Sequence, residues 1–161
     1  MEVLFENRYV RDKEWAKDLS SYIYFCRPAI IAFDVFFLLS LLLYVILHDL
    51  FLLLLPMTWI FLLVFSYFKS VSTTLKRDIE VHGKVIENRV SITNEHIIAE
   101  NSTGSKIYLN YIDVKKAFQT KKYIYLQTKA NLLCSFKKDG FSMGNEEEFV
   151  EFLRNKGVKI K

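Results

Sequence analysis

The most informative pattern in this sequence is a pair of long apolar runs that carry almost no charge. Residues 28–47 and residues 50–68 consist mainly of Leu, Phe, Ile and Val, and only His48 and Asp49 separate them. A helix rises about 1.5 Å per residue, so each run spans about 30 Å, the thickness of the hydrocarbon core of a bilayer. One continuous helix would overshoot the bilayer and bury the polar pair within it. The pattern therefore predicts a transmembrane helical hairpin over residues 28–68.

The segment before the hairpin, residues 1–27, has a mixed pattern with five basic and five acidic side chains. From Tyr9 onward its apolar positions have the loose spacing of a helical stripe, and charged residues fill the other positions. We expect an amphipathic, cytoplasmic helix that lies on the membrane surface or packs on the following domain. A secretory signal peptide is not expected, because a charged segment comes first and the apolar run is too long.

The polar remainder of the chain changes from helical to strand periodicity. Residues 69–83 are predicted to extend the second apolar helix and to end near Gly83. Short alternating segments then follow at intervals of roughly 8 to 12 residues and predict five or six antiparallel strands. The predicted strands are residues 85–93, 96–100, 106–110, 114–120, 123–128 and 132–136. A final amphipathic helix is predicted between the N-cap Asn145 and Gly157.

This order of elements predicts an α+β membrane protein. Residues 84–161 are expected to form a small cytoplasmic domain, an antiparallel β-barrel or sandwich capped by the C-terminal helix. A strand meander closed by a C-terminal amphipathic helix is the pattern of a pleckstrin-homology-like barrel.

Lysine and arginine positions near the apolar runs predict the orientation of the hairpin. Basic residues precede the first run, Lys69, Lys76 and Arg77 follow the second, and the turn between them has neither Lys nor Arg. Basic residues concentrate on the cytoplasmic side of a membrane, so both termini are expected to be cytoplasmic. Trp59 lies near the middle of the second run, and the sequence explains it only as a helix-packing residue.

Asp34 lies about two turns inside the first run, where an ionised carboxylate is costly unless it is paired. In a hairpin with a two-residue turn it faces roughly position 63, and the nearest polar groups are Ser66, Tyr67 and Lys69. We favour a carboxylate near the interface that bonds one of these groups or snorkels toward the lysine. The alternative is a proton or ion site.

Composition limits the chemistry of the chain. It has 161 residues, two cysteines, three histidines that lie far apart in the sequence, and no glycine-rich phosphate loop. No metal or cofactor is therefore predicted, and the chain is expected not to be an enzyme. His96 and Cys134 could meet across strands, but a polar residue beside a buried thiol is the simpler interpretation.

Charge supplies the best candidate for a binding site. Residues 69–161 carry 17 basic and 11 acidic side chains. Seven of the basic residues lie around the predicted 114–128 hairpin and the next strand: Lys115, Lys116, Lys121, Lys122, Lys129, Lys137 and Lys138. Each lysine near an anionic leaflet adds about 1 kcal/mol of attraction, so this face is predicted to contact lipid headgroups. The alternative is a solvated edge, since lysines on edge strands also block aggregation.

Other classes of function fit the same architecture. A cytoplasmic domain on a membrane hairpin suits binding of a protein partner, regulation of another membrane protein, or immunity against a membrane-active toxin. The hairpin can also self-associate. An oligomeric transporter or channel around Asp34 ranks last among these classes. Nucleic acid is a disfavoured partner, because a barrel core and a membrane anchor explain the interleaved tyrosines and lysines more simply.

The residues of the C-terminal domain also resemble a known family. The resemblance is carried by VSITNEHIIAENSTGSKIYLNYIDVKKAFQTKKYIYL at residues 90–126 and by FKKDGFSMGNEEEFVEFL at residues 136–153. Both are similar to the YcxB-like bacterial membrane proteins, which often have Trp where Tyr111 stands here. Nearly the whole chain resembles these proteins in its organisation, which implies two spans in a bacterial inner membrane followed by a cytoplasmic domain. The motifs are structural, so the resemblance implies an architecture and no reaction.

Overall fold

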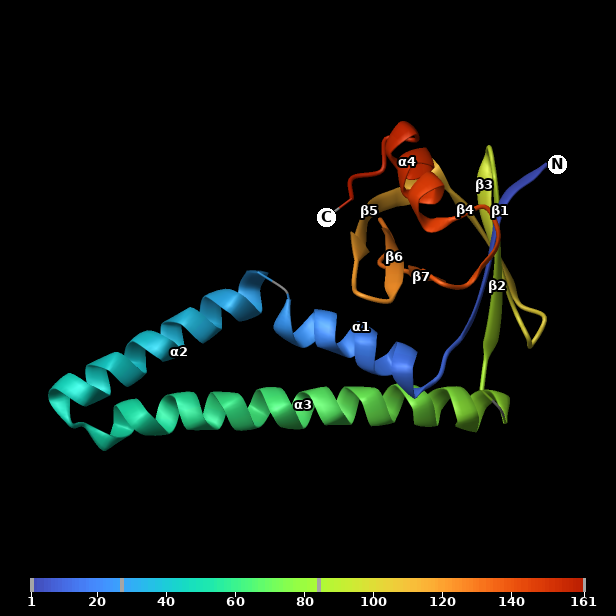
Figure 1. Cartoon of the computed structure of the whole chain (residues 1–161). Helices are drawn as coiled ribbons and strands as arrows, with labels where there is room; N and C mark the ends of the chain where they lie inside the picture. Colours follow the sequence, from blue (N-terminus) through green and yellow to red (C-terminus); the bar gives the residue numbers. More distant parts are fainter. Residues whose placement is uncertain (1, 27, 84, 161) are drawn as a thin grey trace. The chain divides into compact units, whose positions relative to one another are not determined.

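The computed structural model describes residues 2–26, 28–83 and 85–160 (Figure 1). The chain divides into two compact units. One, the sheet unit, consists of Met1–Trp15 and Asp78–Lys161, and the other, the helical unit, is Ala16–Arg77. The helical unit is therefore inserted in sequence between two parts of the sheet unit.

The predicted hairpin forms as two helices, α2 (Pro28–Leu47) and α3 (Leu50–His82). Its turn is tight because His48 takes a left-handed backbone conformation (φ 56°) and the Asp49 side chain accepts a hydrogen bond from the backbone N–H of Phe51 at 2.9 Å. As predicted, α3 continues beyond the apolar run, and it ends next to Gly83.

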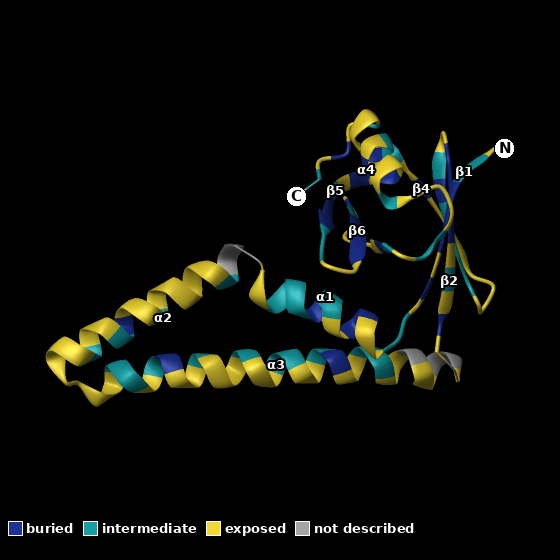
Figure 2. Ribbon diagram, in the orientation of Figure 1, coloured by how far each residue is buried: buried dark blue, intermediate teal, exposed yellow. Residues whose placement is uncertain are grey.

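Both helices are long and apolar enough to cross a membrane, over Ile30–Leu47 and Leu50–Arg77. Only 6% of the residues in the first of these stretches and 11% in the second are buried inside the molecule. Neither α2 nor α3 is therefore a buried core helix (Figure 2). A third helix, α1 (Lys13–Phe25), contacts α3 within the helical unit. There the Ser20 and Ser70 hydroxyls lie 3.2 Å apart, and the rings of Phe25 and Tyr67 pack at 5.6 Å.

The strands of the sheet unit form two antiparallel sheets among the described residues. One has five strands in the order β4-β3-β2-β1-β8, and the other has three in the order β5-β6-β7. The bounds are β1 Val3–Val10, β2 Glu87–Thr93, β3 His96–Asn101, β4 Lys106–Asn110, β5 Val114–Gln119, β6 Tyr123–Thr128, β7 Leu133–Lys137 and β8 Phe141–Met143. The six predicted strands correspond to β2 through β7.

The sheets do not close into a barrel, so the barrel alternative of the predicted fold is wrong. A short 3₁₀ turn, Tyr111–Asp113, separates β4 from β5. The outer edge of β5 is occupied by the C-terminal tail, because Ala117 donates its backbone N–H to Lys159 at 2.8 Å and bridges Ile160. At this position the tail, and not β4, is the neighbour of β5.

The N-terminal segment differs from its prediction. A helix was expected from Tyr9, but β1 occupies Val3–Val10, and α1 begins only after Asp12, whose side chain caps the N–H of Trp15 at 2.9 Å. Strand β1 pairs with β2 on one side and with β8 on the other. It is thus an interior strand of the five-stranded sheet, contributed from before the hairpin.

The core lies between the two sheets and under the C-terminal helix α4 (Glu146–Asn155). As predicted, Asn145 caps this helix by accepting a hydrogen bond from the N–H of Glu148. Phe149 of α4 is fully buried, and its ring centroid lies 5.6 Å from that of Phe5 in β1 and 4.7 Å from that of Phe136 in β7. The helix therefore joins the two sheets through aromatic packing.

Candidate functional site

The structure divides the seven predicted lysines into two groups. Lys121 and Lys122 form the turn between β5 and β6, and Lys137 and Lys138 lie at the end of β7 beside that turn. The backbone N–H of Lys138 donates to the carbonyl of Lys122 at 2.9 Å, which fixes the two pairs next to each other. We call these four residues the turn lysines. With Glu14 and Asp139 they line a pocket of about 330 Å³.

Acidic side chains partly neutralise the turn lysines. Lys122 pairs with Glu14, Lys137 with Asp139 at 3.3 Å, and Lys138 with Glu146 at 2.6 Å. Lys121 makes no ion pair with any residue that the structure describes. The pairs are partly exposed, and such pairs are individually worth at most about 1 kcal/mol, so an incoming anion can compete with the carboxylates.

The other three lysines, Lys115, Lys116 and Lys129, lie at the opposite end of the same hairpin. Lys129 is fixed there by a 2.8 Å hydrogen bond from its backbone N–H to the carbonyl of Asp113. Lys116 and Lys115 precede Lys121 by five and six residues, a length of about 16–20 Å along an extended strand. The seven residues therefore form two basic areas, one at each end of the hairpin.

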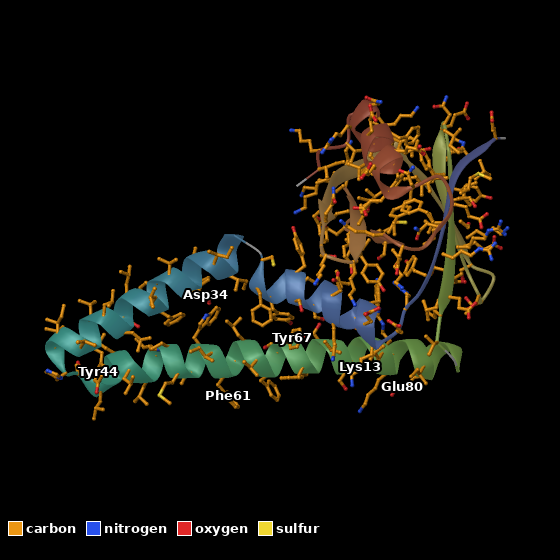
Figure 3. All side chains as sticks on the ribbon, viewed as in Figure 1. Lys13, Asp34, Tyr44, Phe61, Tyr67 and Glu80 are labelled. Atoms are coloured by element: carbon orange, nitrogen blue, oxygen red, sulfur yellow. The ribbon has the colours of Figure 1, made fainter. Side chains whose placement is uncertain are left out.

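In the helical unit, Asp34 pairs with a residue that the sequence did not indicate. The indole Nε1 of Trp59 on α3 donates a hydrogen bond at 2.9 Å to Oδ1 of Asp34. Asp34 lies on α2 (Figure 3). Phe33 and Phe37 hold the indole, each with its ring centroid 5.2 Å from that of Trp59. Trp59, which had no explanation beyond packing, is thus a polar partner of the carboxylate.

This pairing also changes the depth assigned to Asp34. The expected position near Ser66, Tyr67 and Lys69 is wrong, because Trp59 is the tenth of the 19 residues in the second apolar run. Measured along α3, the carboxylate is therefore level with Trp59, at the middle of the second apolar run. Lys69 lies ten residues after Trp59, a distance of about 15 Å along the helix. A charged group at the centre of a membrane helix costs about 2.5–3.5 kcal/mol on insertion scales.

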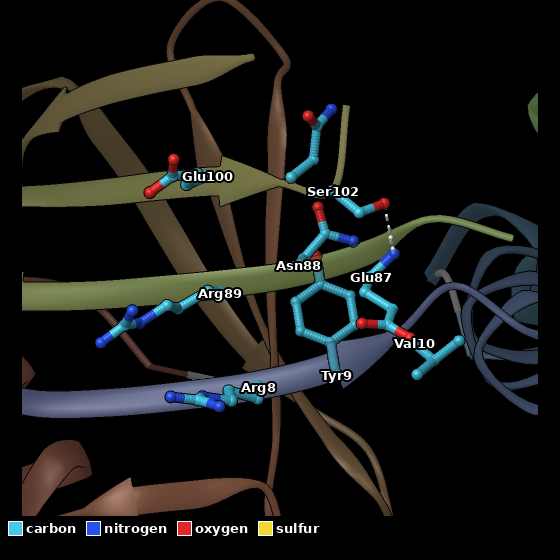
Figure 4. A pocket seen from close by; sticks show the side chains of 9 residues that line it. Arg8, Tyr9, Val10, Glu87, Asn88, Arg89, Glu100 and Ser102 are labelled. Atoms are coloured by element: carbon cyan, nitrogen blue, oxygen red, sulfur yellow. Dashed lines mark hydrogen bonds between the residues drawn. The ribbon is translucent and has the colours of Figure 1, made fainter. Parts of the chain in front are cut away.

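A further polar feature lies on the five-stranded sheet. Glu6 of β1 accepts hydrogen bonds from Arg8 at 2.9 Å, from Ser142 at 3.0 Å, and from Arg89 of β2. Chiefly because of Arg89, the pKa of Glu6 falls to about 2. Arg8 and Arg89 also line a pocket of about 350 Å³ with residues of β2 and β3 (Figure 4). Because both guanidinium groups are engaged by Glu6, we assign no chemistry to this pocket.

The possible His96–Cys134 pair does not form a catalytic arrangement. Burial raises the pKa of the Cys134 thiol to about 12, so the thiol stays protonated and is a poor nucleophile. Within the described residues, His96 Nε2 lies 3.6 Å from a carboxylate oxygen of Glu95, and no hydrogen bond joins it to Cys134.

A known protein family matches part of the sheet unit. Residues 92–153 match the model of the family described as YcxB-like protein. This part of the chain is YcxB-like. The resemblance expected from the sequence is therefore confirmed over a region that begins at the end of β2 and reaches into α4. The match includes the turn lysines and excludes β1 and the hairpin. No curated protein matches the chain.

Proposed function

We propose that this chain is a two-span protein of a bacterial inner membrane, with both termini in the cytoplasm, and that its sheet unit binds anionic lipid headgroups through the turn lysines. Two long helices with exposed apolar surfaces support the membrane insertion. The basic residues before α2 and after the apolar part of α3, with none at the turn, support the orientation.

We further propose that the sheet unit is a pleckstrin-homology-like domain in an open form. Two antiparallel sheets with a C-terminal helix packed at their junction support this assignment. In this proposal the domain binds a ligand and does not catalyse a reaction.

The observation that carries the lipid proposal is that four lysines line one pocket. Lys122, Lys137 and Lys138 each pair with an acidic side chain, whereas Lys121 makes no ion pair with a described residue and can meet an anion without first breaking one. An anionic headgroup that enters the pocket displaces the weak pairs and gains about 1 kcal/mol for each lysine it meets.

The experiment compares hydrogen–deuterium exchange of the full chain in nanodiscs of neutral phosphatidylcholine and in nanodiscs that also contain anionic phosphatidylglycerol. We expect slower exchange of residues 119–123 and 136–140 in the anionic nanodiscs, and loss of this protection at high salt.

A matched pair of variants distinguishes binding at the turn lysines from attraction by the overall charge of the sheet unit. Lys121→Gln/Lys122→Gln removes two charges at the turn and is expected to abolish the protection. Lys115→Gln/Lys129→Gln removes two charges at the other end of the hairpin and is expected to retain it. Equal exchange in both nanodiscs, or equal effects of the two variants, would refute the lipid proposal.

A second candidate function is favoured by a different observation. The pairing of Asp34 with Trp59 leaves an exposed carboxylate on an apolar helix, which suits a regulatory or immunity subunit that contacts another membrane protein.

A further inference from the structure

The helical unit carries a polar group that its own residues satisfy only in part. We propose that Asp34 and Trp59 form a docking point for a membrane-spanning helix of another protein, one that carries a lysine or arginine near the middle of its span. This inference rests on the proposed membrane insertion of α2 and α3.

The first step of the argument concerns the hydrogen bonds of the carboxylate. A carboxylate has two oxygens that together accept about four hydrogen bonds. Oδ1 of Asp34 accepts one from Trp59, and no described residue donates a second bond to either oxygen. The Asp34 side chain is exposed on α2 (Figure 3). In a bilayer this surface meets lipid tails, which offer no donor, unless a protein covers it.

The second step concerns whether the carboxylate can escape to water. Trp59 holds it level with the middle of the second apolar run, and the indole is itself fixed between the rings of Phe33 and Phe37. Asp is also a short side chain, unlike the lysines and arginines that snorkel to the interface. Asp34 is therefore held at its depth, and no described residue of its own hairpin bonds its remaining lone pairs.

The third step identifies the occupant by charge complementarity. Residues 28–68 contain no Lys or Arg, and the one histidine there, His48, lies at the turn. A second copy in the same orientation would bring another Asp34 to the same depth, and two carboxylates repel each other. A helix with a cation at mid-span supplies the missing charge and the missing donors. Intramembrane acids and bases pair with each other in this way.

The test uses designed peptides as probes. The full chain, labelled with a fluorescent donor at its C-terminus, is placed in neutral vesicles with an acceptor-labelled Leu/Ala helix that has a single central Lys. A matched peptide has Leu at that position. We expect energy transfer to report about tenfold stronger association with the Lys peptide. Asp34→Asn is expected to remove this preference, and the control Asp49→Asn, at the turn, to retain it.

Four results would overturn the inference. Equal association of both peptides, or a preference that survives Asp34→Asn, would remove Asp34 as the docking group. Self-association of the chain that is lost in Asp34→Asn, without any peptide, would assign the surface to a second copy. Resistance to carbonate extraction is measured first. A chain that is extracted from the vesicles would refute membrane insertion, and the inference with it, whereas an inserted chain without a Lys preference refutes the inference alone.

Discussion

Asn7 provides a direct test of how the two sheets are joined. It lies on β1, is fully buried, and reaches the backbone of Lys137 on β7 with both ends of its amide. Its Nδ2 donates to the Lys137 carbonyl at 2.7 Å, and its Oδ1 accepts from the Lys137 N–H at 3.0 Å. One side chain thus bonds the five-stranded sheet to the three-stranded sheet.

The cost of Asn7→Ala can be worked out from these partners. The Lys137 carbonyl keeps a second donor, the N–H of Gly140 at 3.0 Å, so losing Nδ2 costs about 1 kcal/mol. The Lys137 N–H loses the acceptor provided by Asn7, and an unpaired buried donor costs about 1–3 kcal/mol. We therefore expect Asn7→Ala to lower the free energy of unfolding of the sheet unit by about 2–4 kcal/mol. Asn7→Asp should cost at least as much, because a carboxylate oxygen then faces the Lys137 carbonyl.

Tryptophan fluorescence can follow this unfolding separately from the helical unit. The chain has two tryptophans, and Trp15 is buried in the sheet unit, where its Nε1 donates to the Ser135 hydroxyl at 3.1 Å. In a Trp59→Phe background, urea titration of the full chain in neutral micelles reports on Trp15 alone. The control Asn110→Ala removes an exposed amide whose Nδ2 makes one long hydrogen bond, 3.3 Å, to Asp113. It should lower the free energy of unfolding by under about 0.5 kcal/mol. If Asn7→Ala is no more destabilising than this control, the proposed join between the sheets is wrong.

Three further predictions concern the sheet unit. Residues 84–161 alone should fail to fold, by near-ultraviolet circular dichroism, whereas the same residues joined by a short linker to β1 should fold, because β1 is an interior strand. Glu6→Gln should lower stability at neutral pH. The pKa of Glu6 is about 2 in the folded state and 4.5 ordinarily, so its ionised form stabilises the fold fully above pH 4.5. The difference in free energy of unfolding between the parent chain and the variant should therefore shrink as the pH falls toward 2. Asn145→Ala removes the N-cap of α4 and should lower the free energy of unfolding, measured by urea titration, by about 1 kcal/mol. Asn145→Asp should lower it little, because Asp is also a good N-cap.

Much of the fold could be predicted because its signals are local. The apolar runs defined α2 and α3, the two-residue periodicity defined β2 through β7, and Asn145 marked the start of α4. Strand β1 was missed because its inward-facing positions include the polar Asn7, which interrupts the apolar alternation. Its partner β2 also begins about 80 residues later, and no local pattern specifies so distant a pairing.

The candidate sites show the same limit. The lysines were found from composition, but their division into two groups depends on how β7 returns beside the β5–β6 turn. The Asp34–Trp59 bond was missed because the expected register of the hairpin paired position 34 with position 63, one helical turn away from Trp59. The sequence signal for this bond was an acid in one apolar run and, in the other, a tryptophan explained only by packing.

The pairing of β1 with β2 constrains the membrane topology that we propose. Val10, at the end of β1, pairs with Glu87, at the start of β2, and the N–H of Arg11 donates to the carbonyl of Ile86 at 2.9 Å. The hairpin is therefore inserted between two adjacent strands, and both must lie on the same side of the bilayer. Only an even number of crossings satisfies this condition. A chain in which α2 crossed and α3 did not would separate β1 from β2 and leave the five-stranded sheet without an interior strand. The sheet is thus consistent with the proposed two-span arrangement and excludes a single crossing, and under that proposal folding of the sheet unit depends on insertion of both helices.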